Sequence, residues 1–141
     1  MPKTYKTDYA YKNGTAYFII YYKEFTFMGK AKCHPDDLDM ESERTGLTIA
    51  EARAYIKMKK FIRRHEIKPI IDAYNHMLKN IQSSSKHNPK AYESCMIRSQ
   101  INHWENKLFE LSADIADEEK YLKEYIEQKD KLYRKLRARN K

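Results

Sequence analysis

Residues 5–33, YKTDYAYKNGTAYFIIYYKEFTFMGKAKC, decide the fold of the first part of the chain. Asn13 and Gly14 separate two runs that are rich in tyrosine and isoleucine, and this dipeptide tolerates the two positive φ angles of a tight hairpin turn. A third run, FTFMGKAKC, alternates between aromatic or small residues and mostly polar ones. The pattern predicts a three-stranded antiparallel sheet with one covered face.

The tyrosines of this segment allow two interpretations. They could form a platform for base stacking or protein binding, because an aromatic ring offers a flat face with a polar edge. Packing between neighbouring strands is the interpretation we favour, since aromatic residues are common in strands in any case. The residues concerned are Tyr5, Tyr9, Tyr11, Tyr17, Tyr21 and Tyr22.

Helical periodicity follows the sheet. Thr48 and Glu51 have the spacing of a capping box, which predicts a helix that starts at Ile49. Apolar residues then recur every three or four positions as far as Ile81. Pro69 lacks an amide hydrogen and clashes with the preceding turn, so a kink or break is expected near residues 66–68.

A long second helical segment begins after Asn88 and Pro89, a cap followed by proline at the first helical position. Residues 90–141 contain no glycine or proline and show a heptad repeat of apolar residues. We expect the helices of residues 49–83 to cover its first half and its second half to form a homodimer. The predicted dimer seam consists of Ile115, Leu122, Tyr125, Leu132 and Leu136.

The predicted fold class is therefore α+β, with a three-stranded antiparallel sheet, a kinked helix and a long C-terminal helix resembling a coiled coil. Residues 1–88 and 89–141 are expected to form one folding unit, since 141 residues suit a single domain. No segment has the length and apolarity of a membrane span or signal peptide, which predicts a cytoplasmic protein. Cys33 and Cys95 are expected to be small packed residues without a disulfide.

The net charge of +8 is unevenly distributed. Basic residues dominate residues 48–88, and residues 131–141 contain six basic and no acidic residues. Both regions are candidate surfaces for an anionic partner, although charged side chains also cover most exposed helices. The candidate partner-binding residues are Lys57, Lys60, Arg63, Arg64, Arg134 and Arg137.

The segment CHPDDLDMESERTG, residues 33–46, is the richest in chemically active side chains. Its Cys-His pair lacks a converging partner, and its carboxylates lack the offsets of a calcium loop. It is expected to be a connection before a helix, or an acidic lip in which Asp36, Asp37 and Asp39 bind a basic patch on a target protein. The scattered histidines have no metal-binding spacing, so we expect no enzymatic activity, cofactor or bound metal.

The stretch AKCHPDDLDMESERTGLTIAEARA, residues 31–54, resembles a family of small, mostly uncharacterised proteins of phages and prophages of Gram-positive bacteria. The resemblance includes Gly29, Cys33, His34, Pro35 and the Ala50-Glu51 helix start, and the later NPKAYE is also similar. It implies a phage context and brings no assigned activity.

Two functions are predicted. The first is a phage-encoded, non-enzymatic inhibitor of host antiviral defence, of the anti-CRISPR type, which binds a defence nuclease or nucleoprotein stoichiometrically. The alternative is a nucleic-acid-binding accessory protein that contacts DNA or RNA through the basic helix flank and the basic tail. An enzyme or metal protein centred on residues 33–46 is a third possibility.

Overall fold

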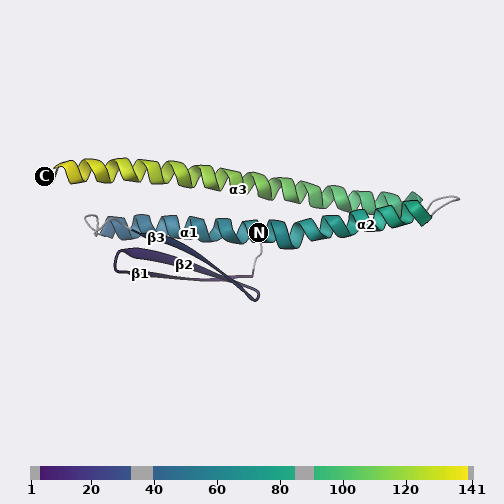
Figure 1. Cartoon of the computed structure of the whole chain (residues 1–141), viewed down its shortest axis with the longest axis horizontal. Coiled ribbons are helices and arrows are strands. Elements are labelled where there is room, and N and C mark those ends of the chain that lie inside the picture. Colours follow the sequence, from purple (N-terminus) through teal and green to yellow (C-terminus); the bar gives the residue numbers. More distant parts are fainter. Residues whose placement is uncertain (1–3, 33–39, 85–90, 140–141) are drawn as a thin grey trace. The chain divides into compact units, whose positions relative to one another are not determined.

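The computed structural model describes residues 4–32, 40–84 and 91–139. Three strands, β1 (Lys6–Lys12), β2 (Thr15–Tyr22) and β3 (Phe25–Lys32), precede the helices (Figure 1). These are α1 (Met40–Ile62), the short π-helix η2 (Arg63–Ile67), α2 (Lys68–Ser84) and α3 (Ala91–Arg139). The α+β class predicted from the sequence is confirmed.

The sheet is an antiparallel meander with strand order β1-β2-β3. Lys12 pairs with Thr15 across the first turn, where Asn13 and Gly14 have φ angles of 55° and 78°. Two consecutive positive φ angles match the right-handed twist of the strands, which explains why this dipeptide fixes the hairpin. The predicted turn is confirmed.

The chain forms two compact units, each of which combines residues from both sides of the boundary expected at residues 88 and 89. Unit 1 contains residues 1–59 and 115–141, and unit 2 contains residues 60–114. Unit 1 therefore holds the sheet, most of α1 and the C-terminal part of α3. Unit 2 holds η2, α2 and the first part of α3.

Small residues bring α1 against one face of the sheet in unit 1. Ala16, Ala31 and Ala50 form a buried cluster, and a Cβ atom at Gly29 would lie 1.8 Å from the backbone oxygen of Ala50. No side chain larger than hydrogen fits at this contact, so the backbones of β3 and α1 meet directly there. The sheet face that carries Gly29 and Ala31 is the covered face predicted from the alternation.

Aromatic side chains also pack between the sheet and α1. Tyr55 contacts the ring of Phe18 at a centroid distance of 5.8 Å, and its hydroxyl donates a hydrogen bond to the hydroxyl of Tyr5 at 3.3 Å. Burial is the main cause that raises the pKa of Tyr55 well above its ordinary value, and the hydrogen bond to Tyr5 adds to the shift. Tyr55 is therefore neutral throughout the physiological pH range.

The opposite side of α1 meets α3 in unit 1. The hydroxyl groups of Thr45 and Tyr133 are 3.3 Å apart in a buried hydrogen bond, and Lys59 forms an ion pair with Glu118. Thr45 and Lys59 are about four turns apart on α1, as are Tyr133 and Glu118 on α3 in the reverse direction. The two helices are thus antiparallel, and α1 lies between the sheet and α3.

This packing gives part of the predicted dimer seam a partner in its own chain. Ile115 is only 2% exposed, whereas Leu132 is 38% exposed and the adjacent Tyr133 is buried. Leu122, Tyr125 and Leu136 are half-buried. A straight α-helix drifts by about 20° per heptad relative to a strict seven-residue repeat, which explains why Tyr133 replaces Leu132 on the buried face. The homodimer stays a prediction.

The predicted start of the first helix is wrong. The helix begins at Met40, and Thr48 lies inside it, where its hydroxyl donates to the backbone oxygen of Arg44 at 2.9 Å. A threonine inside a helix commonly makes this bond to the carbonyl four residues earlier. The Thr48-Glu51 spacing therefore has no capping role here.

In unit 2, the π-helix η2 stands where a kink or break was predicted near residues 66–68, and the chain stays helical without interruption. The amide of Lys68 donates to the oxygen of Arg63, five residues earlier, so a π-turn precedes the proline and α2 continues after it. The wider turn lets the chain stay helical where Pro69 cannot donate a hydrogen bond. The core of this unit is built from buried isoleucines of its helical segments: Ile62, Ile67, Ile71, Ile97 and Ile101.

Candidate nucleic-acid interface

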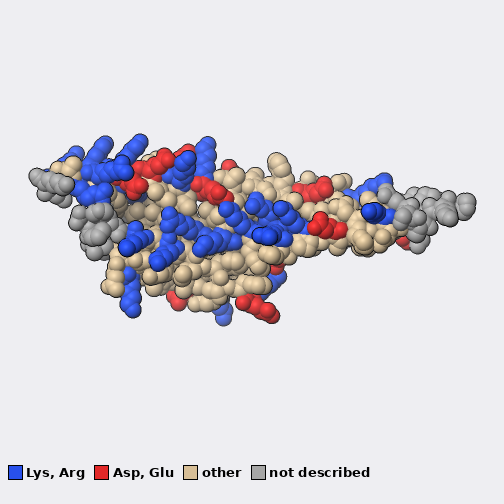
Figure 2. All heavy atoms as spheres, viewed as in Figure 1, with Lys and Arg blue, Asp and Glu red and all other residues tan. Residues whose placement is uncertain are grey.

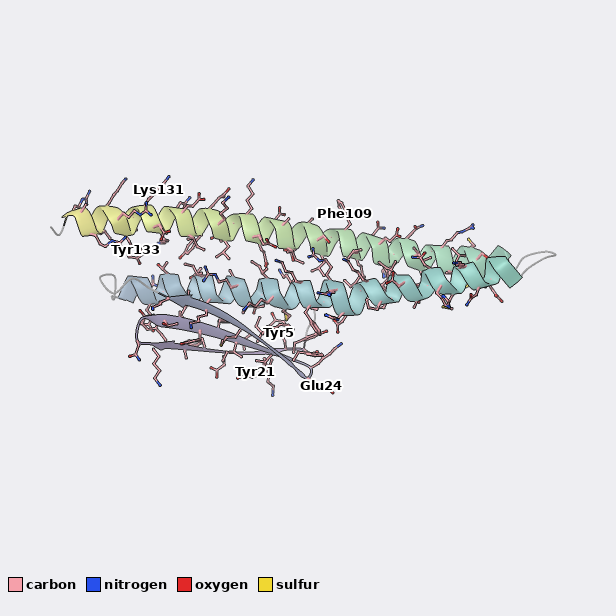
Figure 3. All side chains as sticks on the ribbon, in the orientation of Figure 1. Tyr5, Tyr21, Glu24, Phe109, Lys131 and Tyr133 are labelled. Atoms are coloured by element: carbon pink, nitrogen blue, oxygen red, sulfur yellow. The ribbon has the colours of Figure 1, made fainter. Side chains whose placement is uncertain are left out.

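The face of the sheet turned away from α1 exposes aromatic and basic side chains. Side chains alternate along each strand, so the residues between the buried Ala16, Phe18 and Ile20 of β2 project to this outer face. Tyr21 is 45% exposed and lies on the side of the sheet away from α1, whereas Tyr5 lies between the sheet and α1 (Figure 3). We call this surface the outer sheet face; it includes Lys6, Asp8, Ala10, Lys12, Tyr17, Ile19, Tyr21, Thr26, Met28, Lys30 and Lys32.

The strand register sets a lysine beside each of the two outer tyrosines. Tyr21 pairs with Lys6 of β1, and Tyr17 pairs with Lys30 of β3. The ammonium group of Lys30 lies 5.8 Å from the centroid of the Tyr17 ring, within the range of a cation–π contact. The tyrosines of the central strand are therefore flanked by positive charge from the two edge strands.

The charge of the outer sheet face is mainly positive. Lys6, Lys12, Lys30 and Lys32 are all exposed, and Asp8 is the acidic residue that the register places among them. The lysines come from both edge strands, so they stand on either side of the tyrosines of β2. A face with rings in the middle and ammonium groups at its edges suits a ligand with both flat apolar groups and negative charge.

Two further basic side chains of α1 lie along the edge of β3. Arg53 donates from Nη1 to the backbone oxygen of Lys30 at 2.6 Å, and Lys57 donates from Nζ to the oxygen of Met28 at 2.7 Å. These bonds satisfy carbonyl groups that an edge strand leaves unpaired, and they fix Arg53 at Lys30 and Lys57 at Met28 along β3. Lysine and arginine side chains lie over the α1 ribbon in the space-filling view (Figure 2).

The structure distributes the predicted basic residues over both units. Lys57 belongs to unit 1 and is bonded to β3, whereas Lys60 and Arg64 are exposed and Arg63 is half-buried in unit 2. The contact of Lys57 with β3 was not expected from the sequence. Its role in partner binding stays a prediction.

The predicted residues of the basic tail lie on α3 in unit 1. Arg134 is exposed and Arg137 is half-buried within the last turns of the helix. Lys131 projects away from α1, whereas Tyr133 points towards it (Figure 3). Basic residues here also complement the negative end of the helix dipole, so both interpretations of the tail stay open.

The predicted acidic lip lies outside the described residues, as do Cys33 and His34. Cys95, expected to be packed, is exposed instead. Among the residues that the structure describes, no three His, Cys, Asp or Glu side chains come together to hold a metal ion. The described helices include none with the length and apolarity needed to cross a membrane.

Sequence reasoning missed three contributors to this surface. Lys6 and Lys12 lie outside the basic segments singled out by charge alone, and Arg53 lies within residues 48–88 but was not among the candidate binding residues. The alternation of the third strand did place Lys30 and Lys32 opposite the covered face, and extending it through the hairpin register would have added the lysines of β1. The position of Arg53 had no signal in the sequence, because it depends on how α1 crosses β3.

The chain was also compared with known proteins. It matches no protein-family model, no curated protein sequence and no solved structure.

Proposed function

We propose that the protein is a non-enzymatic nucleic-acid-binding protein and that unit 1 makes the contact. The observation that carries this proposal is the concentration of lysines around the exposed Tyr21 and the half-buried Tyr17 on the outer sheet face, continued along the β3 edge by Arg53 and Lys57. Nucleic-acid binding is the second of the two functions predicted from the sequence. The prediction used the basic helix flank and the basic tail, whereas the surface proposed now lies mainly on the sheet.

The positive charge of this surface supports binding to a phosphate backbone. Each phosphate that a lysine or arginine neutralises releases condensed counterions, so the affinity falls as the salt concentration rises. If the four outer lysines each neutralise one phosphate of a single strand, the logarithm of the binding constant should fall with a slope of about −3 against the logarithm of salt concentration. The slope therefore reports how many of these lysines take part.

The test is fluorescence anisotropy with labelled oligonucleotides at several salt concentrations. Replacing Lys30 and Lys32 by alanine should weaken binding about tenfold or more at low salt and make the slope shallower, because two phosphate contacts are lost. The matched control replaces Lys120 and Lys123, which are exposed on α3, by alanine. Equal effects of the two double variants, or no binding by the unchanged protein, would contradict the proposal.

We also propose, as a second function, inhibition of a host defence nuclease by stoichiometric binding. Unit 1 carries exposed acidic residues on α3 besides its basic sheet, and a nucleoprotein target presents both signs of charge. The acidic residues are Asp117, Glu119, Glu124, Glu127 and Asp130. The phage resemblance supplies the biological context. Purified protein should inhibit at least one member of a panel of defence nucleases at a one-to-one ratio, and a panel without binding or inhibition would reject this function.

A further inference from the structure

We infer that the ligand of the outer sheet face is a single strand of nucleic acid, whose bases stack on Tyr17 and Tyr21. This inference rests on the proposed nucleic-acid binding and specifies its substrate class. It depends on the shape of the surface, on the position of the two rings and on the charge beside each ring.

The shape of the surface favours a single strand over a duplex. The major groove of B-DNA is about 12 Å wide and admits a helix or a two-stranded ribbon. Three strands spaced by about 4.8 Å already span about 10 Å between the outer backbones, before any side chain is added. The outer sheet face is therefore too broad to enter the groove and offers a platform on which unpaired bases can lie.

The two rings are placed for successive stacking contacts along one strand. Tyr17 and Tyr21 both belong to β2, the central strand, and project to the same side. Four residues at about 3.3 Å per residue separate them by about 13 Å. Ile19 lies between them and pairs with Met28, which is 43% exposed, on one side and with Asp8 on the other, so the surface between the rings is apolar towards β3 and carries one carboxylate towards β1.

The charges beside the rings complement a nucleotide rather than an apolar peptide. Each nucleotide combines a flat base with a phosphate, and each outer tyrosine has a lysine as its register partner: Lys6 for Tyr21 and Lys30 for Tyr17. Lys12 and Lys32 extend the positive charge beyond Tyr17 at the hairpin end of the sheet. A paired duplex could use the lysines, but its stacked bases would leave both rings without a partner.

The first experiment compares the unchanged protein with single-stranded and double-stranded oligonucleotides of the same sequence and length. A 15-nucleotide oligo-dT, the corresponding oligo-rU and the dT·dA duplex are suitable probes. We expect at least tenfold tighter binding of the single strands than of the duplex at equal salt concentration. The affinities for oligo-dT and oligo-rU show whether the protein prefers single-stranded DNA or single-stranded RNA.

The second experiment replaces the rings without changing the charge. Tyr17→Leu and Tyr21→Leu should each weaken single-strand binding about 5- to 150-fold, the range that one stacked base contributes, and leave the salt slope unchanged. Tyr17→Phe and Tyr21→Phe keep the ring and should retain binding within about threefold. Circular dichroism on each variant checks that the sheet is intact, and Tyr21 is exposed enough to be replaced without loss of the core.

The outcomes separate the inference from the function on which it rests. Equal binding of duplex and single strand, with leucine variants that bind like the original protein, would overturn the stacking inference and leave phosphate binding in place. Absence of binding to all three probes would overturn both. Loss of single-strand binding in both the leucine and the phenylalanine variants would also reject stacking, because phenylalanine keeps the ring.

Discussion

Gly29 is the residue at which packing between the sheet and α1 is tightest. The atoms that would meet an added Cβ include the oxygen of Ala50 and the amide nitrogen of Ala54, at 1.8 and 2.7 Å. Both are backbone atoms, so no side-chain rotation can relieve the contact. The glycine is required for its lack of volume, because it lies within a regular strand.

Replacement of Gly29 by alanine should therefore destabilise unit 1 strongly. We expect the free energy of unfolding to fall by about 3 kcal/mol or more, at the upper end of overpacking effects, since α1 must move away from β3. Urea denaturation followed by circular dichroism measures the change. Thr26→Ala, on the exposed outer face of the same strand, is the control and should cost less than about 1 kcal/mol. Similar stabilities of the two variants would contradict the close approach.

Tyr55 should make the stability of the protein depend on alkaline pH. Its pKa is raised in the folded state above the ordinary value of 10.0, so the unfolded chain loses the proton first as the pH rises. The stabilisation is complete below pH 10 and is lost progressively above it. Urea denaturation between pH 8 and 11 should show a decline for the original protein and a smaller decline for Tyr55→Phe. Identical profiles would show that other groups cause the decline.

At the scale of elements, the strands were predicted correctly from the sequence and the start of α1 was not. The strands were predictable because the hairpin dipeptide and the alternation act within a few residues. The start of α1 was not, because a Thr-x-x-Glu spacing occurs inside helices as well as at their ends, and only the surroundings of Thr48 distinguish the two cases. Because α1 packs against both the sheet and α3, its sequence lacks the single apolar face that would predict one packing partner.

The contact between α1 and α3 includes a buried charge that can be tested. Lys59 is almost fully buried and pairs with Glu118, whose Oε2 atom is buried without a hydrogen-bond partner. Lys59→Met should cost about 3 kcal/mol, because it leaves the carboxylate without its cation. The double variant Lys59→Met/Glu118→Leu should recover most of this loss, since two apolar groups then pack together.

Urea denaturation of the single and double variants completes this cycle. Lys120→Met, at an exposed position of α3, is the control for loss of one positive charge and should change stability by no more than about 0.5 kcal/mol. A double variant as unstable as Lys59→Met would indicate that the pair contributes by shape and not by charge.

At the scale of the whole molecule, Leu132 is the exposed residue of the predicted dimer seam. Ile115 and Tyr133 are buried within unit 1, whereas Leu132 of the predicted seam is exposed. We expect light scattering at micromolar concentration to give twice the chain mass of 17.0 kDa, and Leu132→Glu to give the monomer. Phe109→Glu, at a residue that is 75% exposed in unit 2, should leave the mass unchanged. A monomer mass for the original protein would reject the dimer.

The candidate site was less predictable than the fold. Charge counts along the chain located the basic helix, but the surface proposed here is assembled from strands β1 and β3 and from α1. Lys6 and Lys30 are far apart in sequence, and only the register of the meander places both of them beside tyrosines of β2. A sequence therefore reveals that lysines gather on one face of a sheet only when each strand residue is assigned to one of the two faces.

The two hydrogen bonds from Arg53 and Lys57 also limit how copies of this chain can polymerise. Growth of a continuous cross-β fibril needs two free edges on every sheet, one to accept the preceding copy and one to offer to the next. Here α1 occupies acceptor groups of β3 with its own side chains. Edge-to-edge association through β1 would therefore end with a closed pair of sheets and would not extend into a filament.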